Sequence, residues 1–217
     1  AVYGLPEINR DIIKKSKLIA NPGCYPTAIQ LALIPLLKKK LINPTNIIAD
    51  AKSGISGAGR NLELKLLMSE AEEDFRAYGV GGHRHLPEIE ENLGCICGED
   101  VKLTFVPHLV PMVRGIHATL YVECIKDFEA YDIFESFYED ESFVDVMLAD
   151  MSPNTKSVRA SNFCRISFHK ETDSNRLMIF SVIDNLMKGA AGQAIQNMNI
   201  VMDWPEASGI SFVPITP

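Results

Sequence analysis

The stretch FCRISFHKETDSNRLMIFSVI, at residues 163–183, contains two short runs rich in β-branched and aromatic residues, at 163–168 and 177–183. Runs of this composition, with alternating apolar and polar positions, are typical of strands. Two more runs of the same character lie at 101–107 and 116–124. Few crossover helices lie between the later runs. The sequence therefore predicts an α+β fold in which a mixed, largely antiparallel sheet is covered by helices on one face.

The segment 26–40 shows helical spacing of its apolar residues and closes with three lysines, which suit the negative end of a helix. We expect Pro35 to bend this helix. The remaining predicted elements are a strand at 46–52, a glycine-rich turn at 53–59, and helices at 61–71, from Pro87 onward, at 131–138 and at 190–202.

The chain has 217 residues, of which 47% are apolar, so it can bury a sizeable core. Its net charge is 21 − 28 = −7. Because nucleic acids and anionic membranes attract positive surfaces, we predict neither as a partner. Residues 18–37 carry no formal charge, but three prolines within them argue against a membrane span. An anionic substrate would therefore need cationic side chains at its own binding site.

Five cysteines are an odd number, spread through a chain too large to need disulfides for stability. This usage favours reduced thiols, and the first twenty residues show no secretory signal. We therefore expect an intracellular protein with at least one thiol left for chemistry.

The motif NPGCYPT at 21–27 places Cys24 after a tight turn and at the start of a predicted helix. Backbone N–H groups and the helix dipole at such a position stabilise a thiolate and any oxyanion formed beside it. Cys24 is therefore a candidate nucleophile that we expect to be ionised. The alternative is a buried, inert thiol. We interpret the other four cysteines as structural.

The cluster His83-Arg84-His85 follows the glycine-rich segment 79–82, which allows the backbone to approach a ligand closely. One imidazole could exchange protons with a substrate, while the other or the guanidinium holds an anionic group. The alternative for each histidine is a surface or satisfied core residue. The remaining histidines lie on strand patterns and are interpreted as structural: His108, His117 and His169.

The loop SGISGAGR at 53–60 has the spacing G-x-x-G-x-G, which matches neither the dinucleotide fingerprint nor the P-loop. A strand followed by glycines, serines and Arg60 still offers N–H groups, hydroxyls and a cation that suit a phosphate or a ribose. The alternative is a flexible turn without a ligand.

Metal binding and serine catalysis both lack their usual spacing. Cys95-x-Cys97 with the two histidines of the cluster lacks a second C-x-x-C or H-x-x-x-H, so we predict no metal. Gly54-Ile55-Ser56-Gly57 lacks the last glycine spacing of a serine nucleophile elbow.

Taken together, the motifs resemble those of the N-acetyl-gamma-glutamyl-phosphate reductase family. They occur in the family's order and extend over nearly the whole chain: NPGCYPT (21–27), SGISGAGR (53–60), HRHLPE (83–88), PMVRG (111–115) and DNLMKGAAGQ (184–193).

The resemblance implies an NADP-dependent enzyme of arginine biosynthesis. Such an enzyme reduces N-acetyl-glutamyl phosphate, a small-molecule acyl phosphate, to N-acetylglutamate semialdehyde and phosphate through a cysteine thioester. The family works in the bacterial cytoplasm or in eukaryotic organelles, and we expect the cytoplasm here. The second domain of such enzymes resembles the C-terminal domain of glyceraldehyde-3-phosphate dehydrogenase and forms homo-oligomers, which implies a dimer or a tetramer.

Members of this family carry a Rossmann domain before the region that matches this chain, so we expect the 217 residues to be the C-terminal catalytic portion. Residues 1–20 would be the remnant of the linker, 21–183 the catalytic and oligomerisation domain, and 184–217 a helix and tail that packs on the missing domain. We expect this portion alone to bind NADP weakly and to turn over slowly or not at all.

Carried over by residue, the resemblance makes Cys24 the nucleophile and His85 the acid and base. The residues that would hold substrate anions are His83, Arg84 and Arg114. The residues that would meet the cofactor are Ser53, Gly54, Ser56, Gly57 and Asn185, the last at the nicotinamide amide.

Three other functions stay open from the sequence. The first is a cysteine-dependent acyltransferase or hydrolase, in which water or an amine resolves the acyl enzyme. The second is a reductase similar to aspartate-semialdehyde dehydrogenase. The third is a dimerisation module whose sheet face joins subunits.

Overall fold

A computed structural model describes residues 1–60, 62–148 and 151–215. Within these ranges seven strands form one sheet in the order β4-β5-β3-β6-β9-β8-β7. Their bounds are β3 (Ile42–Gly54), β4 (Arg76–Ala77), β5 (Leu103–Val110), β6 (Ile116–Cys124), β7 (Val144–Val146), β8 (Cys164–Lys170) and β9 (Arg176–Ile183). Strands β3 and β5, and β7 and β8, pair in parallel, while the other described pairs within this sheet are antiparallel. The predicted α+β fold with a mixed, largely antiparallel sheet is confirmed.

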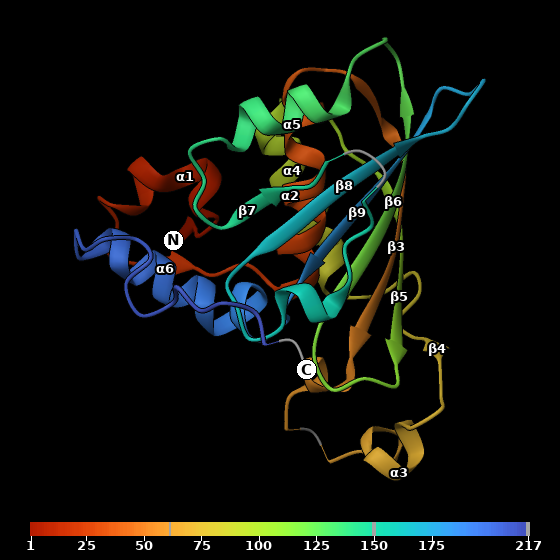
Figure 1. Cartoon of the computed structure of the whole chain (residues 1–217), viewed down its shortest axis with the longest axis vertical. Coiled ribbons are helices and arrows are strands. Elements are labelled where there is room, and N and C mark those ends of the chain that lie inside the picture. Colours follow the sequence, from red (N-terminus) through yellow and green to blue (C-terminus); the bar gives the residue numbers. More distant parts are fainter. Residues whose placement is uncertain (61, 149–150, 216–217) are drawn as a thin grey trace.

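Most of the helices lie on one side of this sheet, whereas the short helix of residues 68–71 lies beyond the ends of β3 and β5 (Figure 1). The α-helices are α1 (Pro6–Ile13), α2 (Cys24–Lys38), α3 (Met68–Ala71), α4 (His85–Cys97), α5 (Ala130–Tyr138) and α6 (Gly192–Val201). Three 3-10 helices, η1 (Ile55–Ala58), η2 (Leu64–Leu66) and η3 (Thr155–Val158), and one π-helix, η4 (Met187–Ala191), complete the helical elements of the described residues. None of these helices is both long enough and apolar enough to cross a membrane.

The alternation of side chains along the strands decides which sheet face meets the helices. On β6, Ala118 and Leu120 are completely buried, whereas Tyr121 on the opposite face is half-buried. Leu120 lies between Ala49 of β3 and Ile179 of β9 in the strand register, and both of these are also completely buried. The core therefore lies between the inner sheet face and the helical layer.

The central helix α2 begins at Cys24, two residues before the predicted start, because Gly23 takes the extended conformation of an N-cap. Pro35 lies inside this helix and has no N–H to donate to the carbonyl of Leu31. The hydroxyl of Tyr138, on α5, donates to that carbonyl instead, at 2.6 Å. The proline is tolerated because another helix supplies the missing donor.

The helix predicted at 61–71 is wrong. Residue 61 is outside the described ranges, and the remainder forms only η2 and α3. Leu62 is 98% exposed and Leu64 72% exposed, so no apolar face packs against the body to stabilise a longer helix. The helix expected from Pro87 begins earlier, at His85, and the one expected at 190–202 begins with the π-turn η4.

The two terminal segments pack against each other. The short strands β1 (Val2–Tyr3) and β2 (Ile19–Ala20) pair in parallel. On α1, Arg10 pairs with Glu206 and Glu7 pairs with the completely buried Lys188. The expected division into linker, catalytic domain and C-terminal tail stays a prediction.

Candidate active site

Cys24 is the first residue of α2, so its side chain lies at the positive end of the longest helix in the described chain. The carbonyl of Gly23 accepts hydrogen bonds from the backbone N–H of Thr27 at 3.0 Å and from its hydroxyl at 2.9 Å. Gln193, from α6, donates to the same hydroxyl at 2.9 Å. The turn before the thiol is therefore fixed by both α2 and the C-terminal helix.

Gly189 packs directly against Cys24, the residue that follows this turn. A Cβ at position 189 would lie 2.7 Å from the Cβ of Cys24, closer than side chains tolerate. This glycine belongs to the π-turn η4, and the i→i+5 geometry of such a turn is frequently found at functional sites. The backbone of η4 can thus lie directly against the nucleophile candidate.

His85 lies on the other side of the turn, at the start of α4. A Cβ on Gly23 would lie 2.5 Å from Nε2 of His85, so the imidazole is packed against the residue that precedes Cys24. Three residues further along α4, Glu88 accepts a hydrogen bond from the N–H of Gly23 at 3.0 Å. The same carboxylate oxygen accepts from the hydroxyl of Tyr3 at 2.8 Å. One helix therefore carries both the imidazole and the carboxylate that hold the turn.

Aromatic rings enclose the two histidines. The ring of His83 lies 4.8 Å from that of His85, 5.7 Å from Tyr25 and 5.5 Å from Tyr78, measured between centroids. Nδ1 of His83 accepts a hydrogen bond from the backbone N–H of His85 at 3.1 Å. This bond makes Nδ1 of His83 the unprotonated nitrogen when the ring is neutral.

The electrostatics of the site differ from the expected ionised thiol. Burial raises the pKa of the Cys24 thiol above its ordinary value of 9.0, and this outweighs the N–H groups at the helix start and the Arg84 guanidinium, which lower it. Burial, with His83 and Arg84 nearby, lowers the pKa of His85 to about 4. At neutral pH the site therefore holds a neutral thiol and a neutral imidazole that line the same cavity.

A cavity of about 460 Å³ opens in front of this pair. It brings together most of the predicted residues: Cys24, Ser53, Gly54, Gly57, His83, Arg84 and His85. Three other predicted residues do not line it: Ser56, Arg114 and Asn185. Residues that the sequence analysis missed also line it: Tyr25, Ala58, Glu63, Lys65, Leu66, Arg76, Ala77, Tyr78 and Leu109. Tyr25 follows the cysteine directly and Tyr78 precedes the glycine-rich segment, and their positions in the sequence were the only signal.

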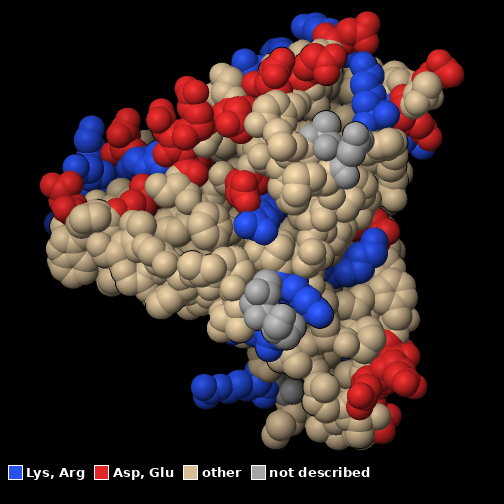
Figure 2. Space-filling view, in the orientation of Figure 1, with Lys and Arg blue, Asp and Glu red and all other residues tan. Residues whose placement is uncertain are grey.

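The charges that line the cavity differ from the acidic net charge of the whole chain. Lys65, Arg76 and Arg84 contribute cations to its lining, of which Lys65 pairs with Glu63 and Arg76 pairs with Asp74. Acidic side chains gather along the upper edge of the molecule, over α5, and again at the lower right, near β4 and α3 (Figure 2). The acidic net charge of the chain is therefore compatible with an anionic ligand at this cavity.

The glycine-rich loop uses its first N–H groups within the protein. The N–H groups of Gly54, Ile55 and Ser56 donate to the carbonyls of residues 115, 112 and 113, at 3.0, 2.9 and 3.1 Å. A Cβ on Gly54 would lie 2.7 Å from the carbonyl oxygen of Val113, so glycine is needed for this close approach. These three N–H groups are not free to bind a phosphate, whereas Ser53, Gly54 and Gly57 still line the cavity.

Asn185 and Arg114 have partners within the chain. The amide oxygen of Asn185 accepts from the N–H of Gly115 at 2.6 Å, and its amide nitrogen donates to the hydroxyl of Ser56 at 3.0 Å. The guanidinium of Arg114 donates to the buried Asp184 at 3.0 Å. In this structure Asn185 binds the glycine-rich loop and Arg114 binds Asp184, and direct contacts of either residue with ligands stay predictions.

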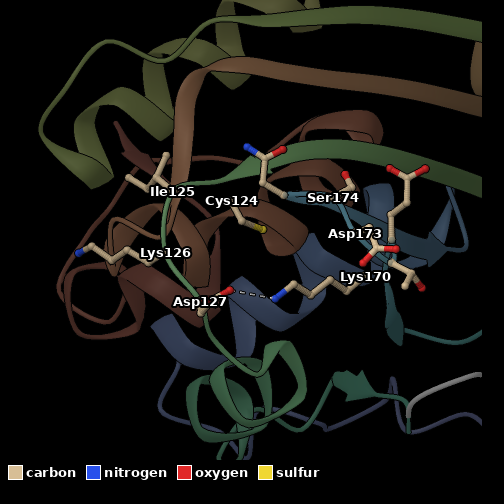
Figure 3. Close-up of a pocket in the computed structure, with 10 residues that line it drawn as sticks. Cys124, Ile125, Lys126, Asp127, Lys170, Asp173 and Ser174 are labelled. Carbon is tan, nitrogen blue, oxygen red and sulfur yellow. Dashed lines mark hydrogen bonds and ion pairs between the residues drawn. The ribbon is translucent and has the colours of Figure 1, made fainter.

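A larger hollow of about 630 Å³ lies at the opposite end of the sheet, between the end of β6 and the β8–β9 turn (Figure 3). Its lining includes Cys124 and charges of both signs, and Lys170 lies 3.3 Å from Asp127. It contains none of the predicted site residues. Among the described residues no group of three or more histidine, cysteine or acidic side chains is arranged to hold a metal ion.

The chain has clear similarity to known proteins. Residues 24–185 match the protein family described as semialdehyde dehydrogenase, dimerisation domain. The whole chain is 56% identical to N-acetyl-gamma-glutamyl-phosphate reductase from Laribacter hongkongensis and 54% identical to that from Nitrosomonas eutropha. It spans 64% of the length of each of these relatives. The resemblance drawn from the five motifs is confirmed.

Solved structures share the fold at low sequence identity. Aspartate semialdehyde dehydrogenase II from Vibrio cholerae, solved in complex with ASA, matches 92% of this chain and 67% of its own, with a TM-score of 0.71 and 16% identity. A probable aspartate-semialdehyde dehydrogenase from Pseudomonas aeruginosa matches 90% of this chain and 66% of its own, with a TM-score of 0.70 and 15% identity.

Proposed function

Because the chain belongs to the semialdehyde dehydrogenase dimerisation-domain family, we propose that it is the catalytic part of an N-acetyl-gamma-glutamyl-phosphate reductase. The observation that carries this proposal is the placement of one thiol and one neutral imidazole around Gly23, in front of a cavity with a cationic lining. The reaction proposed is the NADPH-dependent reduction of N-acetyl-glutamyl phosphate to N-acetylglutamate semialdehyde and phosphate, in arginine biosynthesis.

The first step proposed is attack by Cys24 on the acyl carbon. Since burial raises the pKa of the thiol, the thiol must lose its proton during the attack, and the neutral His85 is the base within the same cavity. The sulfur forms a bond to the acyl carbon, the carbon–oxygen bond to phosphate breaks, and phosphate leaves. The product of this step is a thioester on Cys24.

The second step needs two electrons and a proton. NADPH, when bound, supplies them as a hydride to the thioester carbon. The residues that would hold its nicotinamide are Ser53, Gly54 and Gly57, which line the cavity beside the thiol and therefore fit such a group. The carbon–sulfur bond then breaks to release the semialdehyde, and the protonated His85 returns its proton to the leaving sulfur, which restores the Cys24 thiol.

Charge develops on the acyl oxygen in both steps. The N-terminus of α2 supplies free N–H groups next to Cys24, which suit a tetrahedral oxyanion. Arg84 and His83, with the lining cations Lys65 and Arg76, would hold the phosphate and the carboxylate of the substrate. Arg114 would act through its pair with Asp184, by holding the glycine-rich loop.

We further propose that the chain acts as part of a longer protein, with residues 1–20 as linker and 184–217 packing on a preceding cofactor domain. On its own the chain would bind NADP weakly. We propose a homo-oligomer in the cytoplasm, joined through the sheet face that the helices leave uncovered in Figure 1.

The test uses the longer protein that contains this chain, its candidate acyl phosphate and NADPH carrying deuterium at the transferable position. Deuterium in the aldehyde product and an acyl mass on the peptide of Cys24 support the proposal. An acyl mass without any deuterium transfer would instead indicate an acyltransferase or hydrolase. Equal or faster turnover of aspartyl phosphate would favour the aspartate-semialdehyde type of reductase.

A further inference from the structure

The side chain of Tyr3 is connected by hydrogen bonds to the turn that carries the thiol. Tyr3 is the second residue of the short strand β1, within the segment expected to be a linker. Its hydroxyl donates to Oε1 of Glu88 at 2.8 Å. The same oxygen accepts from the N–H of Gly23, one residue before Cys24, at 3.0 Å. One carboxylate oxygen therefore joins Tyr3 to the turn before the nucleophile candidate.

Two side-chain amides orient the hydroxyl of Tyr3. Nε2 of Gln30, a completely buried residue of α2, donates to the hydroxyl oxygen at 3.0 Å. Asn92, one helical turn after Glu88 on α4, donates to the amide oxygen of Gln30 at 2.7 Å. Because the hydroxyl oxygen accepts from Gln30, its own hydrogen is free to be donated to Glu88. These bonds link β1, α2 and α4 at the level of the nucleophile turn.

The hydroxyl of Tyr3 stays protonated. Burial raises its pKa far above the ordinary value of 10.0, and the charge of Glu88 raises it further. The hydrogen of this hydroxyl therefore always faces the carboxylate of Glu88, and a hydrogen bond to a charged group is stronger than one between neutral groups. The pKa of Cys24 is raised by burial and, to a lesser degree, by the charge of Glu88. The donated hydrogen partly offsets that charge.

Gly23 lies between two side chains of α4. The imidazole of His85 packs where a Cβ on Gly23 would be, and Glu88 binds its N–H. The backbone leading into the turn is held from the same strand as Tyr3, since the N–H of Gly4 donates to the carbonyl of Ala20 at 2.8 Å. If the carboxylate of Glu88 turned away, Gly23 would lose one of the two contacts that seat it on α4.

We propose that Tyr3 is a positioning residue for the reduction. Its hydroxyl keeps the carboxylate of Glu88 on the N–H of Gly23 and thereby holds the turn of Cys24 against the imidazole of His85. The proposal rests on the proposed function, and it gives a residue of the expected linker a part in the reaction. Tyr3 does not line the cavity in front of Cys24, so it acts through Glu88 and not on the substrate.

The experiment compares Tyr3→Phe with Tyr131→Phe in the longer protein that contains this chain. Tyr131 is half-buried like Tyr3, but it lies on α5 and lines a separate hollow with Cys124 and Lys170, so it is a matched control. Steady-state kinetics with the candidate acyl phosphate and NADPH give kcat and KM. The rate of Cys24 alkylation by iodoacetamide at a series of pH values reports the thiol without using the reductase activity.

We expect Tyr3→Phe to lower kcat at least tenfold and to leave KM within about twofold, because the catalytic group is misplaced while the binding residues are kept. The pH profile of Cys24 alkylation should move to higher pH, since the charge of Glu88 is no longer offset by the hydroxyl. In a Glu88→Gln background that charge is absent, so Tyr3→Phe should not move the profile further. Tyr131→Phe should change neither kcat nor the profile.

Gln30→Met is the second variant, should Tyr3→Phe fold poorly by circular dichroism. It removes the donor that orients the same hydroxyl, and we expect changes in the same direction.

An unchanged kcat, or an unchanged alkylation profile, in the folded Tyr3→Phe protein would overturn the proposal. A shift of equal size in the Glu88→Gln background would show that Tyr3 does not act through Glu88. A rise in KM as large as the fall in kcat would contradict a positioning role. If the parent protein transfers no hydride, the proposed function is refuted, while the alkylation profiles still decide whether Tyr3 acts on the thiol through Glu88.

Discussion

The imidazole of His85 occupies the space that a side chain at Gly23 would need, with Nε2 placed 2.5 Å from the Cβ position of that glycine. Gly23 precedes the nucleophile candidate and caps its helix. The absence of a side chain at one residue therefore allows the imidazole of His85 to pack against the turn that precedes Cys24.

Gly23→Ala should displace the imidazole or the turn, because a Cβ contact of 2.5 Å cannot be kept. We expect kcat of the longer protein to fall by at least tenfold, the usual order of a misplaced catalytic group. Gly82→Ala is the control, since a Cβ there meets nothing within 4 Å. Equal rates for the two variants would contradict the packing described here.

His85→Asn should lower kcat by about 10²-fold or more, the usual contribution of a positioned acid and base. His83→Asn should lower it less and should raise KM, because His83 is expected to hold a substrate anion. Steady-state kinetics of both variants separate the two roles. A larger loss of kcat in His83→Asn would reverse the assignment.

His85 should also make stability depend on pH. Its pKa is about 4 in the folded chain, mainly because of burial, and 6.5 is its ordinary value. Below pH 6.5 the unfolded chain binds a proton that the folded chain does not, so the contribution is complete above 6.5 and is lost as pH falls toward 4. The loss should reach about 3 kcal/mol.

Urea unfolding at several pH values measures this loss. His85→Gln should flatten the curve between pH 6.5 and 4, whereas His169→Gln, at an exposed position, should leave it unchanged. A curve in His85→Gln as steep as in the parent would show that His85 is not the titrating group.

Glu88→Gln keeps an oxygen that can accept from the N–H of Gly23 but removes the charge. The pKa of Cys24 is raised by burial and, to a lesser degree, by the charge of Glu88. We therefore expect the pH profile of Cys24 alkylation to move to lower pH in the variant. Glu91→Gln, on the exposed side of the same helix, should leave the profile in place.

Tyr138→Phe should destabilise the fold by about 1–3 kcal/mol, the usual cost of an unsatisfied buried carbonyl. The hydroxyl removed is the donor to the carbonyl of Leu31, which Pro35 leaves without its helical partner. Denaturant unfolding measures the change, with Tyr131→Phe on the same helix as the control. An equal effect in both variants would show that the hydrogen bond is not responsible.

The sequence predicted most strands and helices correctly, because each has a periodic pattern of apolar residues, and burial of those residues stabilises the element. The segment 61–71 misled this reasoning. Its leucines are closely spaced, as in a helix, but they face solvent, and a helix without a packed face is not stabilised. Apolar composition alone cannot distinguish a buried face from an exposed one.

The chemical identity of the site came from the sequence by itself, since a cysteine after a Pro-Gly turn, two histidines around an arginine and a glycine-rich loop are local patterns. Only the tertiary structure decided their states. Burial raises the pKa of Cys24 and lowers that of His85, and Asn185 binds the glycine-rich loop rather than pointing into the cavity. Desolvation and hydrogen-bond partners depend on segments far apart in the chain, so no local pattern encodes them.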